Sequence, residues 1–179
     1  IAQAGYSVFS LEYRRTGDVG GGWPGSYQDI LKGIEAAYKV AKEEAQAEEL
    51  VLVGHSAGGH LAVLAGQNVP VAGVVGLAAI TDVEKYAKGS NSCETATPAF
   101  MGGTPEQVAE AYAQASPAKH DVTVKTLLLH GDKDAIVALE HATLSGAVSV
   151  IEEGAGHFDW VHPGSPAFSQ LLNALAQFD

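Results

Sequence analysis

The stretch that decides the fold covers residues 49–64, Glu-Leu-Val-Leu-Val-Gly-His-Ser-Ala-Gly-Gly-His-Leu-Ala-Val-Leu. The apolar residues 50–53 are typical of a buried strand, and the apolar residues after the glycines are typical of a packed helix. The G-x-S-x-G between them predicts a sharp turn with Ser56 at its tip. Gly54 and Gly58 would let the backbone enter and leave that turn without a Cβ clash. We therefore interpret Ser56 as a nucleophile held above the sheet, with a plain tight turn as the alternative.

The helix that begins after Ser56 would direct its first backbone N–H groups toward anything bound beside the serine. A negative charge that develops on a substrate oxygen is stabilised by such donors. The N–H of Ala57 is therefore our candidate for an oxyanion donor.

Length and composition favour one globular domain with a sizeable core. The chain has 179 residues, of which 46% are hydrophobic, and its mean hydropathy is +0.07. The net charge of -11 comes without a Lys/Arg cluster, so we expect no nucleic-acid partner. The apolar run at 69–80 is broken by Pro70, Gly73 and Gly76, so we expect no membrane span. The single cysteine, Cys93, cannot form an internal disulfide, and we expect a cytoplasmic protein.

Apolar periodicity predicts strands that alternate with helices. The expected strands cover 6–13, 50–53, 71–79, 122–130 and 148–152, and the expected helices cover 26–41, 57–65, 104–115, 138–144 and a segment from Pro166 onward. Ser26 is the expected N-cap of the first of these helices. This alternation predicts an α/β fold with a mostly parallel sheet flanked by helices on both faces.

Residues 84–100 show no clear periodicity, and we interpret them as a cap or lid loop. Its side chains Tyr86, Phe100 and Met101 would line a pocket for the acyl or alcohol part of a substrate, or else pack as core. The first six residues read as the end of a helix closed by Gly5, so we suspect that residues before Ile1 are not recorded.

A serine hydroxyl needs a base in contact and a carboxylate that orients the base. In open parallel sheets such groups collect in the loops that follow the strands. Two such loops come after Ser56, and they carry Asp134 and His157. The chain order Ser, Asp, His is the α/β-hydrolase order. Rival candidates are Asp82, Asp132 and Asp159 for the acid, and His55, His60, His120, His130, His141 and His162 for the base.

Three segments resemble the α/β-hydrolase superfamily, namely Gly-His-Ser-Ala-Gly-Gly-His-Leu-Ala at 54–62, His-Gly-Asp-Lys-Asp-Ala-Ile-Val at 130–137 and Gly-Ala-Gly-His-Phe-Asp at 154–159. With Gly-Gly-Trp-Pro-Gly-Ser at 21–26 they are similar to its esterase/lipase and formamidase-like branch. The resemblance implies Ser56 as nucleophile, Asp134 as acid, His157 as base and the Ala57 N–H in the oxyanion hole. It also implies that Asp132, the first Asp of its loop, holds the turn.

The chain departs from that family at its beginning. Members of the family carry a His-Gly-Gly motif on the loop after a third strand, and the backbone N–H groups of this motif complete the oxyanion hole. In the sheet of these members, the third strand lies between the counterpart of residues 6–13 and the strand that leads to Ser56. One hypothesis is that about 60–100 further residues precede Ile1. The other is a reduced sheet in which 6–13 pairs directly with 50–55, and in which Gly20, Gly21, Gly22 or Trp23 supplies the missing donor.

We therefore expect a single α/β-hydrolase domain over 1–179, truncated or reduced at its N-terminus, with a cap around 84–115. The expected activity is that of a serine hydrolase of the carboxylesterase type, acting on a small-molecule ester through an acyl-enzyme. An amidase of the aryl-formamidase kind, a prolyl-oligopeptidase-like peptidase and a catalytically impaired binding module are the alternatives. His, Cys, Asp and Glu show no metal-ligand spacing, so we expect no metal and no cofactor.

Overall fold

The computed structural model describes residues 1–44 and 49–178. The helices are α1 (Gly25–Glu44), α2 (Ala57–Gly66), α3 (Val83–Tyr86), α4 (Ser92–Met101), α5 (Ala109–Ala115) and α6 (Pro166–Leu175), and the strands are β1 (Val51–His55), β2 (Gly73–Leu77), β3 (Thr126–Gly131) and β4 (Val148–Glu152). Short 3-10 helices cover Ala2–Ala4, Pro117–Lys119, Leu139–Ala142, Asp159–Val161 and Ala176–Phe178.

The four strands form one parallel sheet in the order β1-β2-β3-β4. Gly54 of β1 lies beside Gly76 of β2, which in turn lies beside Leu128 of β3. All four strands therefore end at the same edge, and the loops that follow them meet there.

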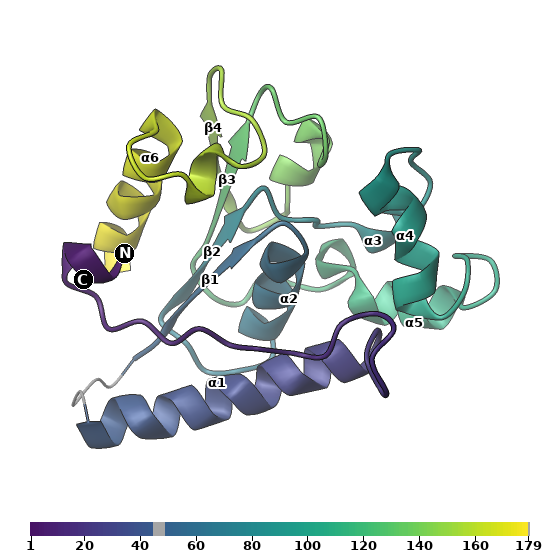
Figure 1. Ribbon diagram of the computed structural model, residues 1–179, viewed down its shortest axis with the longest axis horizontal. Coiled ribbons are helices and arrows are strands. Elements are labelled where there is room, and N and C mark those ends of the chain that lie inside the picture. The colour runs from purple at the N-terminus through teal and green to yellow at the C-terminus, as the bar shows by residue number, and fades with distance from the viewer. Residues whose placement is uncertain (45–48, 179) are drawn as a thin grey trace.

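Helices cover both faces of the sheet, as expected (Figure 1). On one face Val74 of β2 and Leu128 of β3 pack with Ala62 and Val63 of α2, and α1 lies beyond α2. On the other face, the alternate residues of the same two strands pack against α6 and the turn before it. These strand residues are Val75, Leu77, Leu127 and Leu129, and they lie in one cluster with Trp160 and Leu171. Because successive strand residues point to opposite faces, a strand buried on both sides must be apolar throughout, and β2 and β3 contain no charged residue.

The helices α3, α4 and α5 lie together at one end of the molecule (Figure 1). They have a hydrophobic cluster of their own, which includes Tyr86, Met101, Tyr112 and Val137. Val137 belongs to the loop after β3, so this cluster joins the cap helices to the loop that carries Asp134.

Residues 6–13 do not form the expected strand. In the described residues the sheet order begins at β1, which pairs with β2. The hypothesis of a reduced sheet is therefore wrong. A groove of about 700 Å³ is lined by residues of both segments, 5–11 with Tyr13 and 49–55, and by apolar side chains of α1. The β propensity of these residues is not enough, because a strand needs a neighbour for its backbone hydrogen bonds.

The cap region also differs from the expectation. Residues 84–100 contain the helices α3 and α4 instead of a loop. The capping box of Asn91 and Glu94 starts α4. Pro98 inside the helix hides its periodicity in the sequence. The next helix begins at Ala109 and not near Thr104, and 138–144 yields only a single 3-10 turn.

The first long helix begins one residue before the expected cap. Ser26 is buried in the first turn of α1, where its Oγ accepts from the N–H of Gly22 at 3.1 Å and donates to the carbonyl of Arg14. Asp29 of the same helix forms an ion pair with Arg14, with 2.7 Å between Oδ2 and Nε. These contacts fix the loop at 14–25 to α1.

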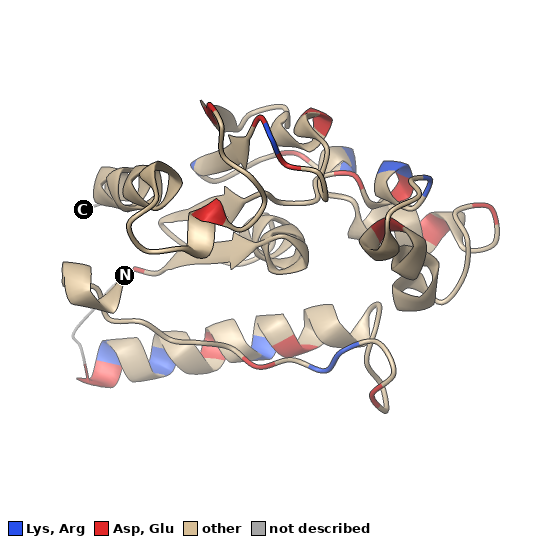
Figure 2. Ribbon diagram, turned by 45° about the horizontal axis from the view of Figure 1, so that its top comes forward, with Lys and Arg blue, Asp and Glu red and all other residues tan. Residues whose placement is uncertain are grey.

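Charged residues lie along α1, on the cap helices and in the loops (Figure 2). In the part of the chain that the structure describes, no helix combines the length and the apolar character needed to cross a membrane.

Candidate active site

Ser56 lies at the tip of a strained turn between β1 and α2. Its backbone has φ 56° and ψ -119°, a conformation that non-glycine residues rarely adopt. The N–H of Ser56 donates to the carbonyl of Leu77 at 2.8 Å, which ties the turn to β2. This geometry is that of the nucleophile elbow.

Only one of the two glycines that frame the elbow is required for space. A Cβ on Gly54 would collide with the carbonyl of Gly58, because strand and helix cross closely there. A Cβ on Gly58 itself would meet no atom within 4 Å. The expectation that both glycines relieve a clash is therefore correct for Gly54 alone.

Ala57 follows Ser56 directly, is the first residue of α2 and is exposed to solvent. A backbone N–H in the first turn of a helix has no partner within the helix. The Ala57 N–H therefore remains a candidate oxyanion donor.

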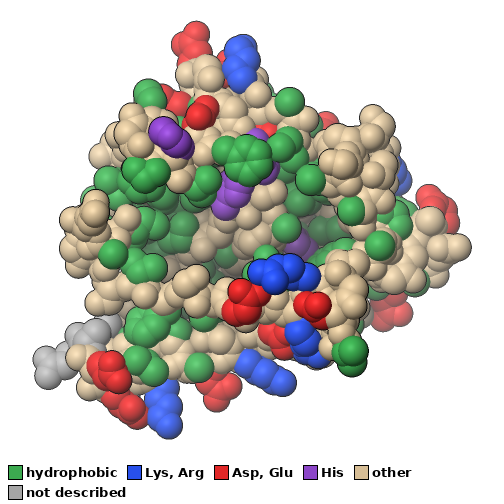
Figure 3. Space-filling view, viewed as in Figure 1, with side chains coloured by type: hydrophobic (Ala, Val, Ile, Leu, Met, Phe, Trp, Pro, Cys, Tyr) green, Lys and Arg blue, Asp and Glu red, His purple; other side chains and the backbone are tan. Residues whose placement is uncertain are grey.

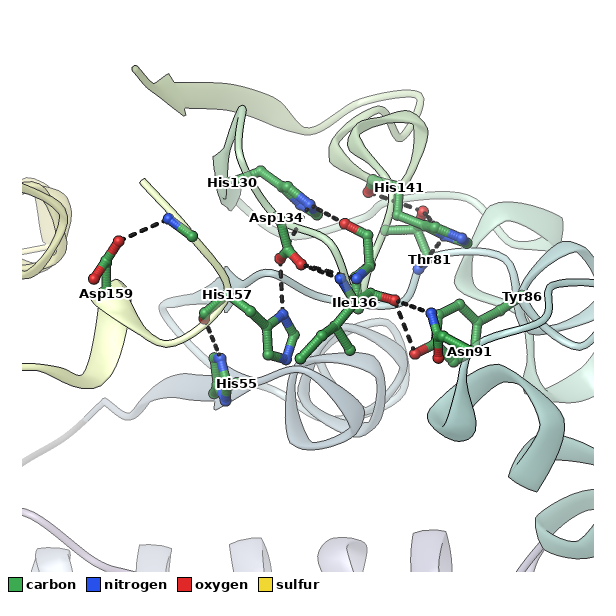
Figure 4. A network of polar contacts seen from close by, with 12 residues as sticks. His55, Thr81, Tyr86, Asn91, His130, Asp134, Ile136, His141, His157 and Asp159 are labelled. Carbon is green, nitrogen blue, oxygen red and sulfur yellow. Dashed lines mark hydrogen bonds and ion pairs between the residues drawn. The ribbon is translucent and has the colours of Figure 1, made fainter. Parts of the chain in front are cut away.

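The carboxylate of Asp134 is fully buried and is bonded on both oxygens. Oδ1 accepts from the N–H groups of Ile136 at 2.8 Å and Val137 at 2.9 Å. Oδ2 lies 2.7 Å from Nδ1 of His157 and 3.6 Å from Nε2 of His130 (Figure 4). The structure thus brings together two side chains that are 23 positions apart in the sequence.

Burial raises the pKa of Asp134, but the hydrogen bonds from His157, Val137 and Ile136 outweigh it, so the pKa of this carboxyl lies below its usual value. Asp134 is therefore ionised at neutral pH. An ionised Asp134 accepts the Nδ1–H of His157, and in the neutral ring this tautomer presents Nε2 as an acceptor.

His157 is buried in the loop after β4, with 7% of the residue exposed. No hydrogen bond joins its ring to Ser56 in residues 1–44 and 49–178. Contacts between nucleophile and base are often long when no substrate is bound. The face of the molecule drawn in Figure 3 is hollowed near its centre, and hydrophobic and histidine side chains gather around the hollow.

Two further aspartates hold the loops that carry the acid and the base. Asp132 Oδ1 accepts from the N–H of Gly154 at 2.6 Å, and this hydrogen bond lowers the pKa of Asp132. Asp159 Oδ2 accepts from the N–H of Gly156 at 2.7 Å. Both side chains thus stabilise turns, and for Asp132 this is the role that the resemblance implies.

The remaining rival candidates lie in other contacts. Asp82 caps α3, where its Oδ1 accepts from the N–H of Lys85 at 3.0 Å. His60 is buried on α2 with Nε2 2.7 Å from the carbonyl of Ala115. Burial lowers the pKa of His60 to about 4, so it stays neutral near pH 7.

Three other histidines contact backbone groups. His130 Nε2 lies 2.8 Å from the carbonyl of Val137, His120 Nε2 lies 3.0 Å from the carbonyl of Gln114, and the Nδ1 of His141 accepts from the N–H of Thr81 at 3.3 Å. His162 is exposed. Of the rival histidines only His55 touches His157, through the backbone carbonyl of that residue.

Of the loop candidates for the second oxyanion donor, Gly21, Gly22 and Trp23 use their N–H groups elsewhere. Gly21 donates to the carbonyl of Asp18 at 2.9 Å, and Trp23 donates to the carbonyl of Phe100 at 2.8 Å. Gly22 donates to Ser26 Oγ. The bond from Trp23 instead fastens this loop to α4 of the cap.

The sequence interpretation missed a contact between the cap and the acid loop. The carbonyl of Ile136 accepts from Asn91 Nδ2 at 2.9 Å and from the hydroxyl of Tyr86 at 3.3 Å (Figure 4). Tyr86 and Met101 are each 3% exposed and belong to the hydrophobic cluster of the cap, so of the two expected roles they have that of core residues. The Asn-x-x-Glu pattern at 91–94 marks the start of α4 in the sequence, but nothing there shows that Asn91 reaches Ile136.

No group of three or more His, Cys, Asp or Glu side chains suited to a metal ion occurs among the residues with described positions.

Residues 1–146 match the BD-FAE family. The chain belongs to this family. BD-FAE is an esterase family of the α/β-hydrolase superfamily, so the resemblance of the chain to that superfamily is confirmed. The matched residues include the elbow and the loop at 130–137, whereas the loop at 154–159 lies outside them.

Solved structures share the fold. The truncated form of a carbohydrate esterase from gut microbiota is 18% identical, with a TM-score of 0.76, and the match covers 98% of this chain and 75% of that one. The acylaminoacyl peptidase of Pyrococcus horikoshii is 20% identical with a TM-score of 0.68, over 86% of this chain and 26% of that one. A puromycin hydrolase is 25% identical with a TM-score of 0.62, over 74% of this chain.

The chain spans 22% of the length of that puromycin hydrolase. No curated protein gives a significant match to the sequence.

Proposed function

We propose that this member of the BD-FAE family is a serine hydrolase that cleaves a small carboxylic ester, with Ser56, His157 and Asp134 as nucleophile, base and acid. The observation that carries the proposal is the buried hydrogen bond of 2.7 Å between Asp134 Oδ2 and His157 Nδ1, at the sheet edge where the Ser56 turn also lies. The esterase family and the carbohydrate esterase of the same fold support the ester as the scissile bond.

The chemistry follows from the proton positions. Ser56 Oγ attacks the ester carbonyl while Nε2 of His157 takes its proton, and Asp134 stabilises the imidazolium that forms. The N–H of Ala57 donates to the oxygen that becomes negative. His157 then returns the proton to the departing alcohol, and water hydrolyses the acyl-enzyme by the same route in reverse.

An amide is the second candidate for the scissile bond. The acylaminoacyl peptidase that shares this fold supports it, as does the puromycin hydrolase. The proton that His157 returns would then go to a leaving nitrogen instead of an oxygen. A catalytically impaired binding module is the third candidate, and the hydrogen bonds that occupy Gly21, Gly22 and Trp23 favour it.

Fluorophosphonate labelling separates these candidates. We expect covalent modification of Ser56, detected by mass spectrometry of the intact protein and its peptides, and no modification of Ser56→Ala. A panel of p-nitrophenyl esters of increasing chain length, N-formylkynurenine and a proline amide then identifies the bond. If the folded wild-type protein is not labelled at Ser56, the proposal of a serine hydrolase is contradicted and the binding module is favoured.

A further inference from the structure

The residue directly before the nucleophile touches the loop that carries the base. The nucleophile turn is defined here as residues 54–58 and the base loop as residues 153–158. His55 Nε2 lies 2.8 Å from the backbone carbonyl of His157. Of the hydrogen bonds among residues 1–44 and 49–178, this is the one that joins the nucleophile turn to the base loop.

The rings of the two histidines are also in contact. Their centroids lie 4.6 Å apart with an angle of 52° between the planes. Phe158 approaches the His157 ring at 5.0 Å edge-on and the His55 ring at 5.7 Å. The imidazole of His157 is thus bounded by His55 and by the carboxylate of Asp134 (Figure 4), and by the ring of Phe158.

We propose that His55 is a positioning residue, which sets the distance between Ser56 Oγ and His157 Nε2 by holding the base loop to the nucleophile turn. The inference rests on the proposed function, because it concerns the same pair of groups. A carbonyl only accepts hydrogen bonds, so Nε2 of His55 must carry a proton. The peptide bond from His55 to Ser56 transmits the position of this donor directly to the nucleophile.

The reason for such a tether is the sensitivity of proton transfer to distance. Asp134 orients the His157 ring from the side of the acid loop, but it does not reach the nucleophile turn. Without the His55 bond, the base loop has no direct hydrogen bond to the turn. A misplacement of about 1 Å between reacting groups costs on the order of 10²-fold in rate.

Two variants separate the donor from the ring. His55→Gln keeps an N–H donor on a side chain of similar reach, and His55→Phe keeps an aromatic ring without a donor. We expect His55→Phe to label with fluorophosphonate about 10- to 100-fold more slowly, and His55→Gln to restore most of the rate. With an ester substrate the loss should fall on kcat and leave KM nearly unchanged.

His120 provides the matched control. Its Nε2 also lies near a backbone carbonyl, that of Gln114 at 3.0 Å, but on an exposed segment. His120→Phe should therefore label at the wild-type rate. Circular dichroism and urea unfolding confirm the fold of each variant, and His55→Leu replaces His55→Phe if that protein does not fold.

Hydrogen exchange in the base loop gives a readout that does not depend on catalysis. The amides of Ala155 and His157 should exchange faster in His55→Phe and at the wild-type rate in His55→Gln. Labelling of His55→Phe at the wild-type rate, or unchanged exchange in that variant, overturns the positioning role. A wild-type protein that does not label contradicts the proposed function instead, and the exchange experiment still decides the role of His55.

Discussion

Both oxygens of the Asp134 carboxylate accept hydrogen bonds from groups of the protein. Two backbone N–H groups of its own loop hold Oδ1, so only Oδ2 is available to His157. The loop sequence therefore fixes the orientation of Asp134, and His157 approaches it from the loop after β4.

Asp134→Asn tests this assignment at the residue scale. The asparagine can still accept from Ile136 and Val137, but its amide would face His157 with a donor and favour the tautomer with the proton on Nε2. That ring cannot take the proton of Ser56. We expect the labelling rate and kcat to fall on the order of 10⁴-fold.

The control for this change is the rival acid Asp82. Asparagine caps a helix about as well as aspartate, so Asp82→Asn should keep both the stability and the labelling rate. Loss of activity in Asp82→Asn with an active Asp134→Asn would reverse the assignment of the acid.

The two glycines of the elbow give a second matched pair. Gly54→Ala forces a Cβ against the carbonyl of Gly58, so we expect a loss of about 3 kcal/mol or more in the free energy of unfolding. Gly58→Ala places its Cβ in open space within α2 and should be neutral or gain up to about 1 kcal/mol. Urea unfolding followed by circular dichroism measures both; equal losses would contradict the difference in packing.

At the scale of elements, α4 connects the cap to the acid loop. Asn91 Oδ1 accepts from the N–H groups of Cys93 at 2.9 Å and Glu94 at 3.0 Å, which starts the helix. Its Nδ2 donates to the carbonyl of Ile136, two residues after Asp134. One side chain therefore caps a helix and positions a neighbouring loop.

Asn91→Asp and Asn91→Ala separate these two contacts. Aspartate keeps the cap and loses the donor to Ile136, whereas alanine loses both. We expect about 1–2 kcal/mol less stability in Asn91→Ala and a smaller loss in Asn91→Asp, measured by urea unfolding. Both variants should label Ser56 about fivefold more slowly, the equivalent of one hydrogen bond of about 1 kcal/mol. Labelling of Asn91→Asp at the wild-type rate would show that the cap contact does not position Asp134.

At the scale of the whole molecule, buried histidines couple stability to pH. His60 is 3% exposed, and burial lowers its pKa to about 4, whereas the unfolded chain has the ordinary value of about 6.5. Below that ordinary value the unfolded chain binds more protons than the folded protein, so stability falls as the pH falls. Burial also lowers the pKa of His55 and His141, which act in the same direction.

We therefore expect the free energy of unfolding to fall by roughly 2 kcal/mol through His60 alone between pH 7 and pH 4.5. Urea unfolding at a series of pH values measures this slope. His60→Gln keeps an N–H donor for the carbonyl of Ala115 and does not titrate, so its slope should be shallower. An unchanged slope in His60→Gln would contradict the role of this group.

Much of the fold and the site follows from local patterns in the sequence. The apolar runs predict β1 to β4, and the boundaries of β4 agree at both ends. Pro166 predicts the start of α6, and the structure adds Ser165 as the residue that caps the helix. Ser56, Asp134 and His157 each follow a strand in the sequence. Because parallel strands end at the same edge of a sheet, this predicts that the three side chains lie at one edge.

Only the tertiary structure decided the strand pairings and the hydrogen bonds whose partners are distant in the sequence. Residues 6–13 have the composition of a strand but remain outside the sheet, because a groove lies where a hydrogen-bonded neighbour is needed. The N–H groups of Gly21, Gly22 and Trp23 are occupied by atoms that local sequence does not assign to them. The contacts of His55 with His157 and of Asn91 with Ile136 arise for the same reason. The sequence alone determines periodicity, caps and turns, whereas packing determines which donor meets which acceptor.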